Sequence, residues 1–391
     1  MLFTTQEIGS VQRPMWRQKL ESGPGKQAIA EAVIWGKRLG VAELDELVNS
    51  KGTGLLQIKR AYSDEEKERI VRIASIYVIR MLEIAGLDRI FDGEQHRTEM
   101  YDTLARRIEG IETAGTLNSF DANYFRKGSI EGRISLAKGA ASFFTDEFSF
   151  IRAHTNRVVK PCLTGPYTMM DWSYLEHYRR ESEGMGLQGK KAISAARSSA
   201  LNDFALRTVN PILKRLSKAG ASVVQIDEPA AATDERESAI FVDSINRAFS
   251  GLPSGVEKAV HLCYSDYSSL FPAIADCVAD SYLIEFTNHA SPTHFRPEDV
   301  DKSTFNALKL FKEYGIKANI GIGVIDIHSD LIETPQVIRD RILYASKVLG
   351  DEALIQVNPD CGLRTRRWDV AFPKLCNMVE GTMLARSEFG V

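Results

Sequence analysis

The 391-residue sequence predicts an α/β fold, a (β/α)8 TIM barrel that forms a single catalytic domain over residues 1–391. Three observations carry the prediction: amphipathic helices alternate with short apolar strands, a glycine often separates the two, and eight strand segments can be counted. Near-continuous apolar strands between helices are typical of a parallel sheet buried on both faces. A doubly wound open sheet is the main alternative, because a strand count from pattern alone does not separate the two folds.

The clearest helix–strand unit begins at Ser63. Ser63 and Glu66 form a capping-box pattern, apolar residues then recur at helical spacing, and Gly86 is a stop signal before the strand 87–91. The same order predicts three further pairs: helix 204–219 with strand 222–226, helix 304–314 with strand 317–322, and a helix from Thr334 and Pro335 to Gly350 with strand 353–357.

Eight strand ends follow from these units and from the remaining apolar runs. The strands are expected to end near Ser10, Glu94, Thr164, Asp227, Cys263, Glu285, Asp326 and Asn358. Two insertions are expected, one between the first and second strands and one between the second and third. The second covers approximately residues 112–154, where the pattern is mixed and glycine-rich.

Composition excludes several classes of protein. Hydrophobic residues make up 44% and charged residues 26% of the chain, proportions that fit a globular protein rather than a disordered one. A net charge of −3 gives no general attraction to nucleic acid or to an anionic membrane, so neither is expected as a partner. The first ten residues lack a signal-peptide pattern, and five scattered cysteines favour a reducing cytoplasm.

Polar residues cluster at the predicted strand ends, which would meet at one mouth of a barrel. His261 and Cys263 are two residues apart and would point from the same side of a strand end, where Glu285 and Cys361 could approach them. Two thiolates, an imidazole and a carboxylate form a tetrahedral donor set that suits Zn²⁺.

Each of these signals has an ordinary structural alternative when it is taken singly. A His-x-Cys pair is commonly a packed core pair, Glu285 could form a strand-end salt bridge, and His328 could cap a helix. Their conjunction at strand ends favours the catalytic interpretation over these alternatives.

Six separated motifs carry a family resemblance that spans nearly the whole chain. They are Ile8-Gly9-Ser10, Gly165-Pro166-Tyr167-Thr168 with Trp172, Gln225-Ile226-Asp227-Glu228-Pro229-Ala230, His261-Leu262-Cys263-Tyr264-Ser265-Asp266, Asp326-Ile327-His328-Ser329 and Val357-Asn358-Pro359-Asp360-Cys361-Gly362-Leu363. They resemble the catalytic C-terminal half of cobalamin-independent methionine synthase. The family's N-terminal barrel has no counterpart here, so the chain resembles a short, single-barrel core member.

The resemblance implies an enzyme that transfers a methyl group to the thiol of L-homocysteine to form L-methionine. By this resemblance the zinc ligands are His261, Cys263, Glu285 and Cys361, and the homocysteine site is formed by Ile8, Gly9, Ser10, Glu94 and Asp227. Trp172 matches the aromatic residue that stacks on the folate pterin, and His328 matches the residue that protonates the leaving group.

The methyl donor stays open between methyltetrahydrofolate and a methylcorrinoid, the latter free or carried on a corrinoid protein. Thr233 stands where the family has an acidic residue near the pterin, which favours a corrinoid, whereas His328 favours folate. Three other functions are weighed: a zinc-dependent thiol alkyltransferase such as epoxyalkane:coenzyme M transferase, a zinc-binding barrel without catalysis, and a metal-free decarboxylase-like barrel.

Overall fold

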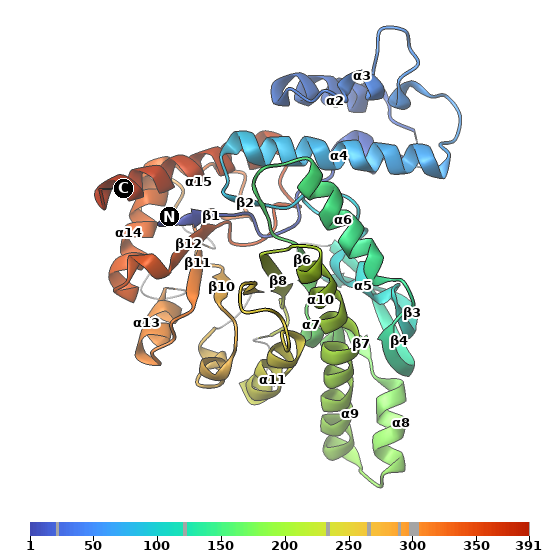
Figure 1. Ribbon diagram of the computed structural model, residues 1–391, viewed down its shortest axis with the longest axis vertical. Helices are drawn as coiled ribbons and strands as arrows, with labels where there is room; N and C mark the ends of the chain where they lie inside the picture. The colour runs from blue at the N-terminus through green and yellow to red at the C-terminus, as the bar shows by residue number, and fades with distance from the viewer. Residues whose placement is uncertain are drawn as a thin grey trace.

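A curled, wholly parallel sheet of seven strands lies at the centre of the computed structural model (Figure 1). The structure describes residues 1–391 except 21–22, 120–122, 232–234, 264–266, 288–290, 297–304 and 391. The strand order is β1-β12-β11-β10-β9-β8-β6, which follows the chain without the reversal of a doubly wound sheet. The bounds are β1 (Thr4–Thr5), β6 (Cys162–Thr164), β8 (Val223–Asp227), β9 (Glu257–Leu262), β10 (Ser281–Ile284), β11 (Asn319–Gly323) and β12 (Ile355–Asn358).

A second, two-stranded parallel sheet lies beside the ends of the first. It pairs β2 (Arg89–Ile90) with β5 (Val158–Val159), and an isolated parallel bridge joins Gln6 to Arg89. A strand is therefore present in each of the eight predicted segments. The predicted ends at Ser10, Glu94 and Asp326 are too late, because β1, β2 and β11 stop three to five residues earlier and irregular backbone continues into the site.

Helices surround the strands on the outside (Figure 1). Their bounds are α1 (Met15–Gln18), α2 (Lys26–Leu39), α3 (Leu44–Leu47), α4 (Asp64–Ala85), α5 (Met100–Ala105), α6 (Ala141–Ala153), α7 (Pro166–Asp171), α8 (Glu176–Gly184), α9 (Gly189–Asp203), α10 (Asn210–Lys218), α11 (Ser238–Ala248), α13 (Asn306–Glu313), α14 (Pro335–Leu349) and α15 (Trp368–Glu388). None of the described helices is long and apolar enough to cross a membrane.

The predicted helix caps are present. The Ser63 hydroxyl accepts from the Glu66 N–H at 3.2 Å, the Glu66 carboxylate accepts from the Ser63 N–H at 2.9 Å, and α4 ends at Gly86 with φ of 94°. Thr334 caps α14 in the same way through the N–H of Val337.

The predicted helix over 204–219 starts too late. In the structure α9 runs into a π-helical segment, Phe204–Val209, and then into α10. Pro211 lies just after the π-helical segment, and wider helical turns of this kind accommodate an interrupted hydrogen-bond ladder. The expected start of the helix at Thr304 lies outside the described residues.

The segment expected as an insertion is ordered secondary structure. The strands β3 (Ile108–Ser119) and β4 (Asn123–Leu136) form an antiparallel hairpin, β4 pairs with β7 (Ser173–Tyr174), and α6 follows. The register shifts near Gly110 and Gly115, which breaks the period-two alternation of a strand. These shifts explain the mixed pattern of the sequence here. The predicted start of the insertion, residue 112, lies inside β3.

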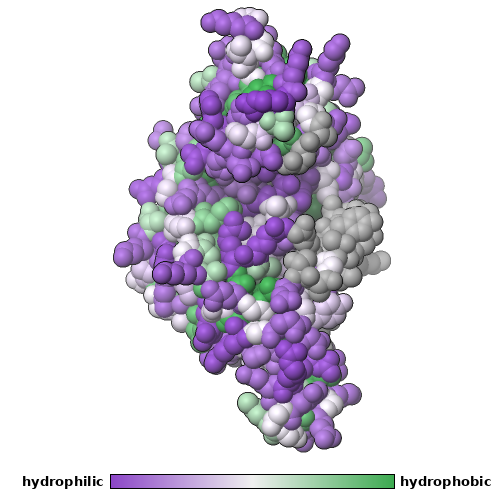
Figure 2. Space-filling model, turned by 90° about the vertical axis from the view of Figure 1, so that its right-hand side faces the viewer, coloured by the Kyte–Doolittle hydropathy of each residue, from purple (hydrophilic) through white to green (hydrophobic). Residues whose placement is uncertain are grey.

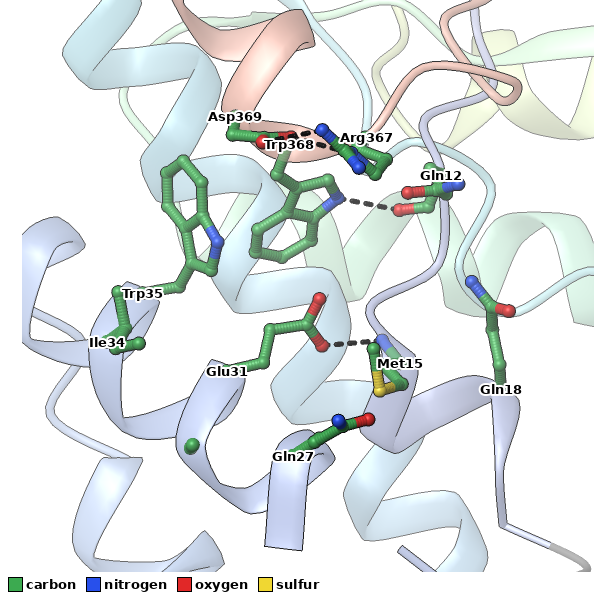
Figure 3. Close-up of a pocket in the computed structure, with 11 residues that line it drawn as sticks. Gln12, Met15, Gln18, Gln27, Glu31, Ile34, Trp35, Arg367, Trp368 and Asp369 are labelled. Atoms are coloured by element: carbon green, nitrogen blue, oxygen red, sulfur yellow. Dashed lines mark hydrogen bonds and ion pairs between the residues drawn. The ribbon is translucent and has the colours of Figure 1, made fainter. Parts of the chain in front are cut away.

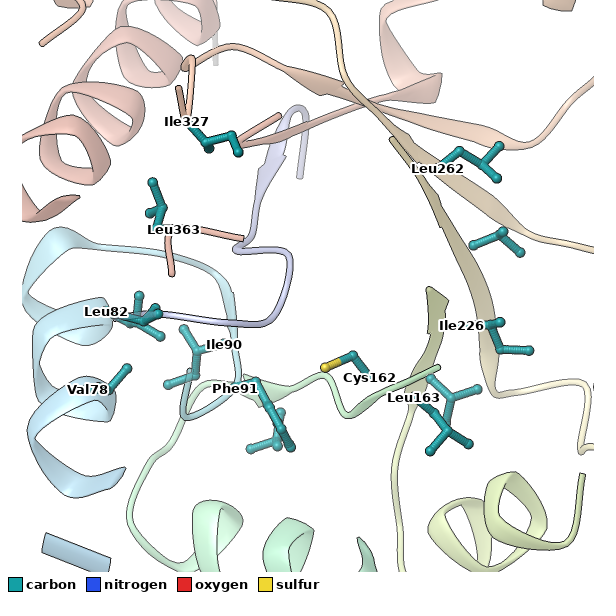
Figure 4. Close-up of a cluster of buried hydrophobic side chains, with 14 of the residues drawn as sticks. Val78, Leu82, Ile90, Phe91, Cys162, Leu163, Ile226, Leu262, Ile327 and Leu363 are labelled. Atoms are coloured by element: carbon teal, nitrogen blue, oxygen red, sulfur yellow. The ribbon is translucent and has the colours of Figure 1, made fainter. Parts of the chain in front are cut away.

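Buried apolar side chains fill the layer between the strands and the helices (Figure 4). Val78 and Leu82 of α4 approach Ile90 and Phe91, and all four are buried. In Figure 4 the sulfur of Cys162 lies on the opposite side of its strand from the neighbouring leucine, towards the space that the strands surround. On the face in Figure 2, hydrophilic side chains dominate and hydrophobic ones occur in small separate groups.

Candidate active site

Three thiol and imidazole side chains converge at the carboxyl ends of β9 and β12. His261 lies in β9, Cys263 is the first residue after that strand, and Cys361 follows β12. Their ligand atoms all lie within 4.8 Å of one another. The Nε2 atom of His261 is 3.4 Å from Sγ of Cys361, which is 3.7 Å from Sγ of Cys263. The structure thus brings together three of the four predicted metal ligands.

The backbone behind His261 orients its ring. Nδ1 lies 3.0 Å from the carbonyl oxygen of Leu283, so this nitrogen donates and Nε2 faces Cys361. Burial lowers the pKa of His261, but the neighbouring Cys361 raises it more, so the net shift is upward. Contact with Cys263 lowers the pKa of the Cys361 thiol well below its usual range, and the same contact raises the pKa of Cys263. The pair therefore holds one thiolate readily, and a metal cation would stabilise both.

Glu285, the fourth predicted ligand, lies at the edge of this group. It follows β10 and is buried, and its N–H donates to the Tyr267 hydroxyl at 3.2 Å. Its carboxylate is not within 4.8 Å of all three other ligand atoms. Instead its Oε1 atom lies 3.9 Å from Nε2 of His328. The predicted ligand and the predicted proton donor are therefore neighbours.

A pocket of about 160 Å³ opens beside the three converging side chains. Its lining contains every residue predicted for the substrate: Ile8, Gly9, Ser10, Glu94, Trp172 and Asp227, together with His261, Cys263 and Cys361. The chain approaches itself closely here, since a Cβ at Gly362 would lie 2.2 Å from the Ser10 hydroxyl oxygen. A side chain at position 362 would force Ser10 to move, since its backbone oxygen and nitrogen would also lie within 3.1 and 3.2 Å of the added Cβ.

Two carboxylates face this pocket. Glu94 has φ of 60°, a left-handed conformation that is uncommon for a residue with a side chain, and its N–H donates to Asp92 at 2.9 Å. Asp227 ends β8, and its Oδ1 accepts from the Gln225 amide at 2.6 Å. Burial raises the pKa of Asp227 to about 6, with Glu94 adding to the rise. Oxygens of the two carboxylates and Sγ of Cys162 lie within 4.8 Å of one another.

A buried carboxylate that the sequence did not single out positions the pocket wall. Glu228 accepts from the N–H groups of Tyr167 and Thr168 at 3.0 and 2.7 Å, and from the Thr168 hydroxyl at 2.7 Å. These bonds fix the start of α7, which leads directly to Trp172. The available sequence signal for Glu228 was its place next to Asp227 in the motif of residues 225–230.

Other contributors to the site also escaped the sequence. Asp360 accepts from the N–H groups of Phe286 and Thr287, and so ties the loop after β12 to the loop after β10. Its place next to Cys361 was the available signal. Arg97 contacts Glu94, and no motif or spacing pointed to it. Thr233, the predicted departure near the pterin, lies outside the described residues.

A larger cleft of about 580 Å³ lies apart from these residues, between α2 and the start of α15 (Figure 3). Trp35 and Trp368 meet edge to face there with ring centroids 5.4 Å apart. The Trp368 indole donates to the Gln12 carbonyl at 2.7 Å, and Glu31 accepts from the Met15 N–H at 2.6 Å. The residues that line this cleft include no cysteine or histidine.

Comparison with solved structures places the fold among known ones. A B12-independent methionine synthase from Shewanella sp. W3-18-1, solved in complex with selenomethionine, matches 100% of this chain and 99% of its own with a TM-score of 0.73. A putative vitamin-B12 independent methionine synthase from Listeria monocytogenes matches 97% of this chain with a TM-score of 0.59. Sequence identities are 21% and 16%, so these likenesses concern the fold.

Sequence comparison gives the family. The family model of the cobalamin-independent synthase catalytic domain matches residues 55–383. The methionine synthase of Thermoplasma volcanium is 36% identical over 330 residues, 83% of this chain and 91% of that protein. That of Thermoplasma acidophilum is 38% identical over 307 residues, 77% of this chain and 85% of that protein. The chain belongs to the cobalamin-independent methionine synthase family and is a methyltransferase that acts on homocysteine.

Proposed function

We propose that this enzyme is a cytoplasmic, zinc-dependent methyltransferase that forms L-methionine from L-homocysteine within one catalytic domain over residues 1–391. One observation carries the proposal: the donors that suit a metal and the two carboxylates that suit an ammonium line the same pocket. Homocysteine bears its thiol and its amino group at opposite ends of a short chain. A pocket with both kinds of group is complementary to it.

The proposed domain is a closed (β/α)8 barrel, in which β5 and β6 act as one interrupted strand. The pairing of β2 with β5 and the bridge between Gln6 and Arg89 support closure between the first and last strands of the main sheet. The hairpin of β3 and β4 with α6 is then an insertion on the barrel, and α2 with α3 is the other. A closed barrel places all strand ends at one mouth.

The residues present fit zinc. Two thiols and an imidazole nitrogen within 4.8 Å suit a soft, tetrahedral site, and the carbonyl of Leu283 holds His261 with Nε2 towards the site. We assign Cys263, Cys361 and His261 as ligands, with the nearby Glu285 as the exchangeable fourth. Bound zinc would supply a positive charge that keeps a thiol deprotonated at neutral pH.

The chain's own residues bind and orient the substrates. Glu94 and Asp227 hold the ammonium of homocysteine, and the loop of Ile8, Gly9 and Ser10 closes the pocket around it. Trp172 provides an aromatic face for the methyl donor. Holding thiol and methyl group in line lowers the barrier to transfer.

His328 is the proposed proton donor for a folate leaving nitrogen. The backbone N–H of His328 donates to Asp326 at 2.7 Å, which fixes the loop that carries His328. Its ring lies beside Glu285. A folate leaves as an amine that must be protonated, whereas a methylcorrinoid leaves as a cobalt species and needs no acid. The role of this residue therefore depends on the donor.

Methionine formation by the zinc-loaded protein tests the proposal, with methyltetrahydrofolate and methylcobalamin supplied in parallel. We expect methionine from at least one donor, and His328→Gln to abolish turnover with folate while sparing turnover with the corrinoid. His154→Gln, at an exposed histidine, is the matched control. Zinc-loaded protein that forms methionine from neither donor would contradict the proposed reaction.

A further inference from the structure

A buried guanidinium contacts Glu94, one of the two carboxylates proposed to bind the substrate ammonium. Arg97 is 4% exposed and forms a two-pronged ion pair with Glu147 of α6, with Nε to Oε1 at 3.1 Å and Nη2 to Oε2 at 2.8 Å. Its Nη1 atom donates to Oε1 of Glu94 at 3.1 Å, and Nη2 also donates to the Cys162 carbonyl at 2.9 Å. One rigid side chain thus joins two carboxylates.

The contact leaves Glu94 oriented for a ligand. Arg97 and the Cys162 thiol, at 3.4 Å, both donate to Oε1 of Glu94. Among the described residues, no hydrogen bond goes to Oε2, and the Glu94 side chain lines the pocket. The backbone at Glu94 is also strained, since its φ of 60° lies in the left-handed region.

Charge explains why Glu147 is needed. Burial lowers the pKa of Arg97, but Glu147 and Glu94 hold this pKa above its ordinary value, so the guanidinium is charged. A simple pair of Arg97 and Glu94 would carry no net charge and would leave the attraction of an ammonium mainly to Asp227. Burial raises the pKa of Glu147, but its two-pronged pair with Arg97 opposes the rise and favours the carboxylate anion. With Glu147 ionised, the three groups together carry one negative charge, and the exposed part of that charge faces the pocket.

We propose that Glu147, which does not line the pocket, determines specificity for thiols that carry an amino group. It pairs with Arg97 so that Arg97 can align Glu94 without neutralising it. Glu147 and Arg97 are positioning residues, and the ligand class is a thiol with an α-ammonium group. The inference rests on the proposed function, since it assumes that the substrate ammonium binds at Glu94 and Asp227.

Binding of two ligands to the zinc-loaded protein tests the inference by calorimetry. L-Homocysteine and 4-mercaptobutanoate share the thiol and the carboxylate, and the second lacks the amino group. Glu147→Gln keeps the shape of the side chain and removes its charge. We expect the Kd of homocysteine to rise about tenfold, while the Kd of 4-mercaptobutanoate changes less than about twofold. An equal loss for both ligands would show a merely structural role and overturn the inference.

A double variant separates the charge effect from a structural one. In Arg97→Met/Glu147→Gln the cation that neutralises Glu94 is gone, so homocysteine should bind more tightly than to Glu147→Gln, but more weakly than to the wild type because Glu94 is no longer aligned. A purely structural role predicts that the double variant binds worse than the single one. If Glu147→Gln does not fold, Arg97→Lys replaces it, because one point charge cannot hold both carboxylates; homocysteine alone should lose affinity.

The matched control is Glu257→Gln. Glu257 also forms a two-pronged pair with an arginine, Arg89, at 2.8 and 2.7 Å, but it lies outside the pocket. It should leave the ratio of the two Kd values unchanged. Wild-type protein that binds both ligands equally would refute the amino-group site itself, whereas discrimination that survives Glu147→Gln would refute only the inference.

Discussion

The Nε2 atom of His261 lies 3.4 Å from Sγ of Cys361, although 100 residues separate the two in the sequence. Their strands, β9 and β12, are not neighbours, because β10 and β11 lie between them. In a flat sheet three inter-strand spacings would set the backbones about 14 Å apart. The curl of the sheet therefore brings these candidate metal ligands together, and flattening it would separate them.

The first prediction concerns metal content. Protein purified under reducing conditions should hold one zinc per chain, and Cys361→Ser should lower this several-fold, because a hydroxyl is a poor replacement for a thiolate ligand. Inductively coupled plasma mass spectrometry measures it. Cys376→Ser, on α15, is the control and should keep its zinc. Equal zinc in both variants would remove Cys361 from the ligand set.

The second prediction concerns pH. Glu7 is 2% exposed, and neither carboxylate oxygen has a hydrogen-bond partner among the described residues. Burial raises its pKa from 4.5 to about 8, against the opposing effect of Lys160. A carboxyl whose pKa is higher in the folded state stabilises the fold at low pH, and this stability is lost as pH rises from about 4.5 to about 8.

Glu7→Gln should therefore raise the melting temperature relative to the wild type at pH 8 and give a much smaller difference near pH 5. Thermal unfolding at several pH values, followed by circular dichroism, measures the gap. Glu380→Gln, at an exposed position of α15, should show no such trend. A gap that does not change with pH would mean that Glu7 titrates normally.

The third prediction concerns the loop that carries His328. Lys374 is fully buried and pairs with Glu333 at 2.8 Å, and it also donates to the Asp326 carbonyl at 2.9 Å. Lys374→Met would leave a buried carboxylate without its cation, so we expect a loss of about 3–5 kcal/mol of unfolding free energy. Denaturant unfolding measures it.

Two comparisons qualify this loss. Lys374→Met/Glu333→Gln should be more stable than Lys374→Met, since no charge is then buried alone. Arg247→Met breaks an exposed pair with Asp243 and should cost less than about 1 kcal/mol. A double variant no better than the single one would show that packing, not charge, holds the loop.

Much of the fold and the centre of the site could be predicted from the sequence, because both leave local signals. Ser63, Glu66 and Gly86 mark their helix through short-range hydrogen bonds and backbone conformation. The chemistry at strand ends indicated which residues would meet. Helical periodicity could not show that the helix before β8 starts at Gly189, since the π-helical segment shifts the phase of the apolar face.

Residues that act through tertiary contacts gave no such signal. Arg97 and Glu147 are 50 positions apart, and nothing in their neighbourhoods predicts that they pair. The exact distance of Glu285 from the other donors depends on the path of its loop. The bulges in the hairpin of β3 and β4 interrupt its alternation, so the sequence showed a mixed pattern there and did not predict the two strands.

The parallel pairing of β1 with β12 has a consequence for synthesis of the chain. Residues 8–10 and Cys361 meet only when the last strand joins the first, so the pocket cannot form before β12 has been made. A nascent chain presents His261 and Cys263 about a hundred residues before Cys361 leaves the ribosome. A metal ion would therefore meet all the candidate ligands together only after the last strand has joined the first.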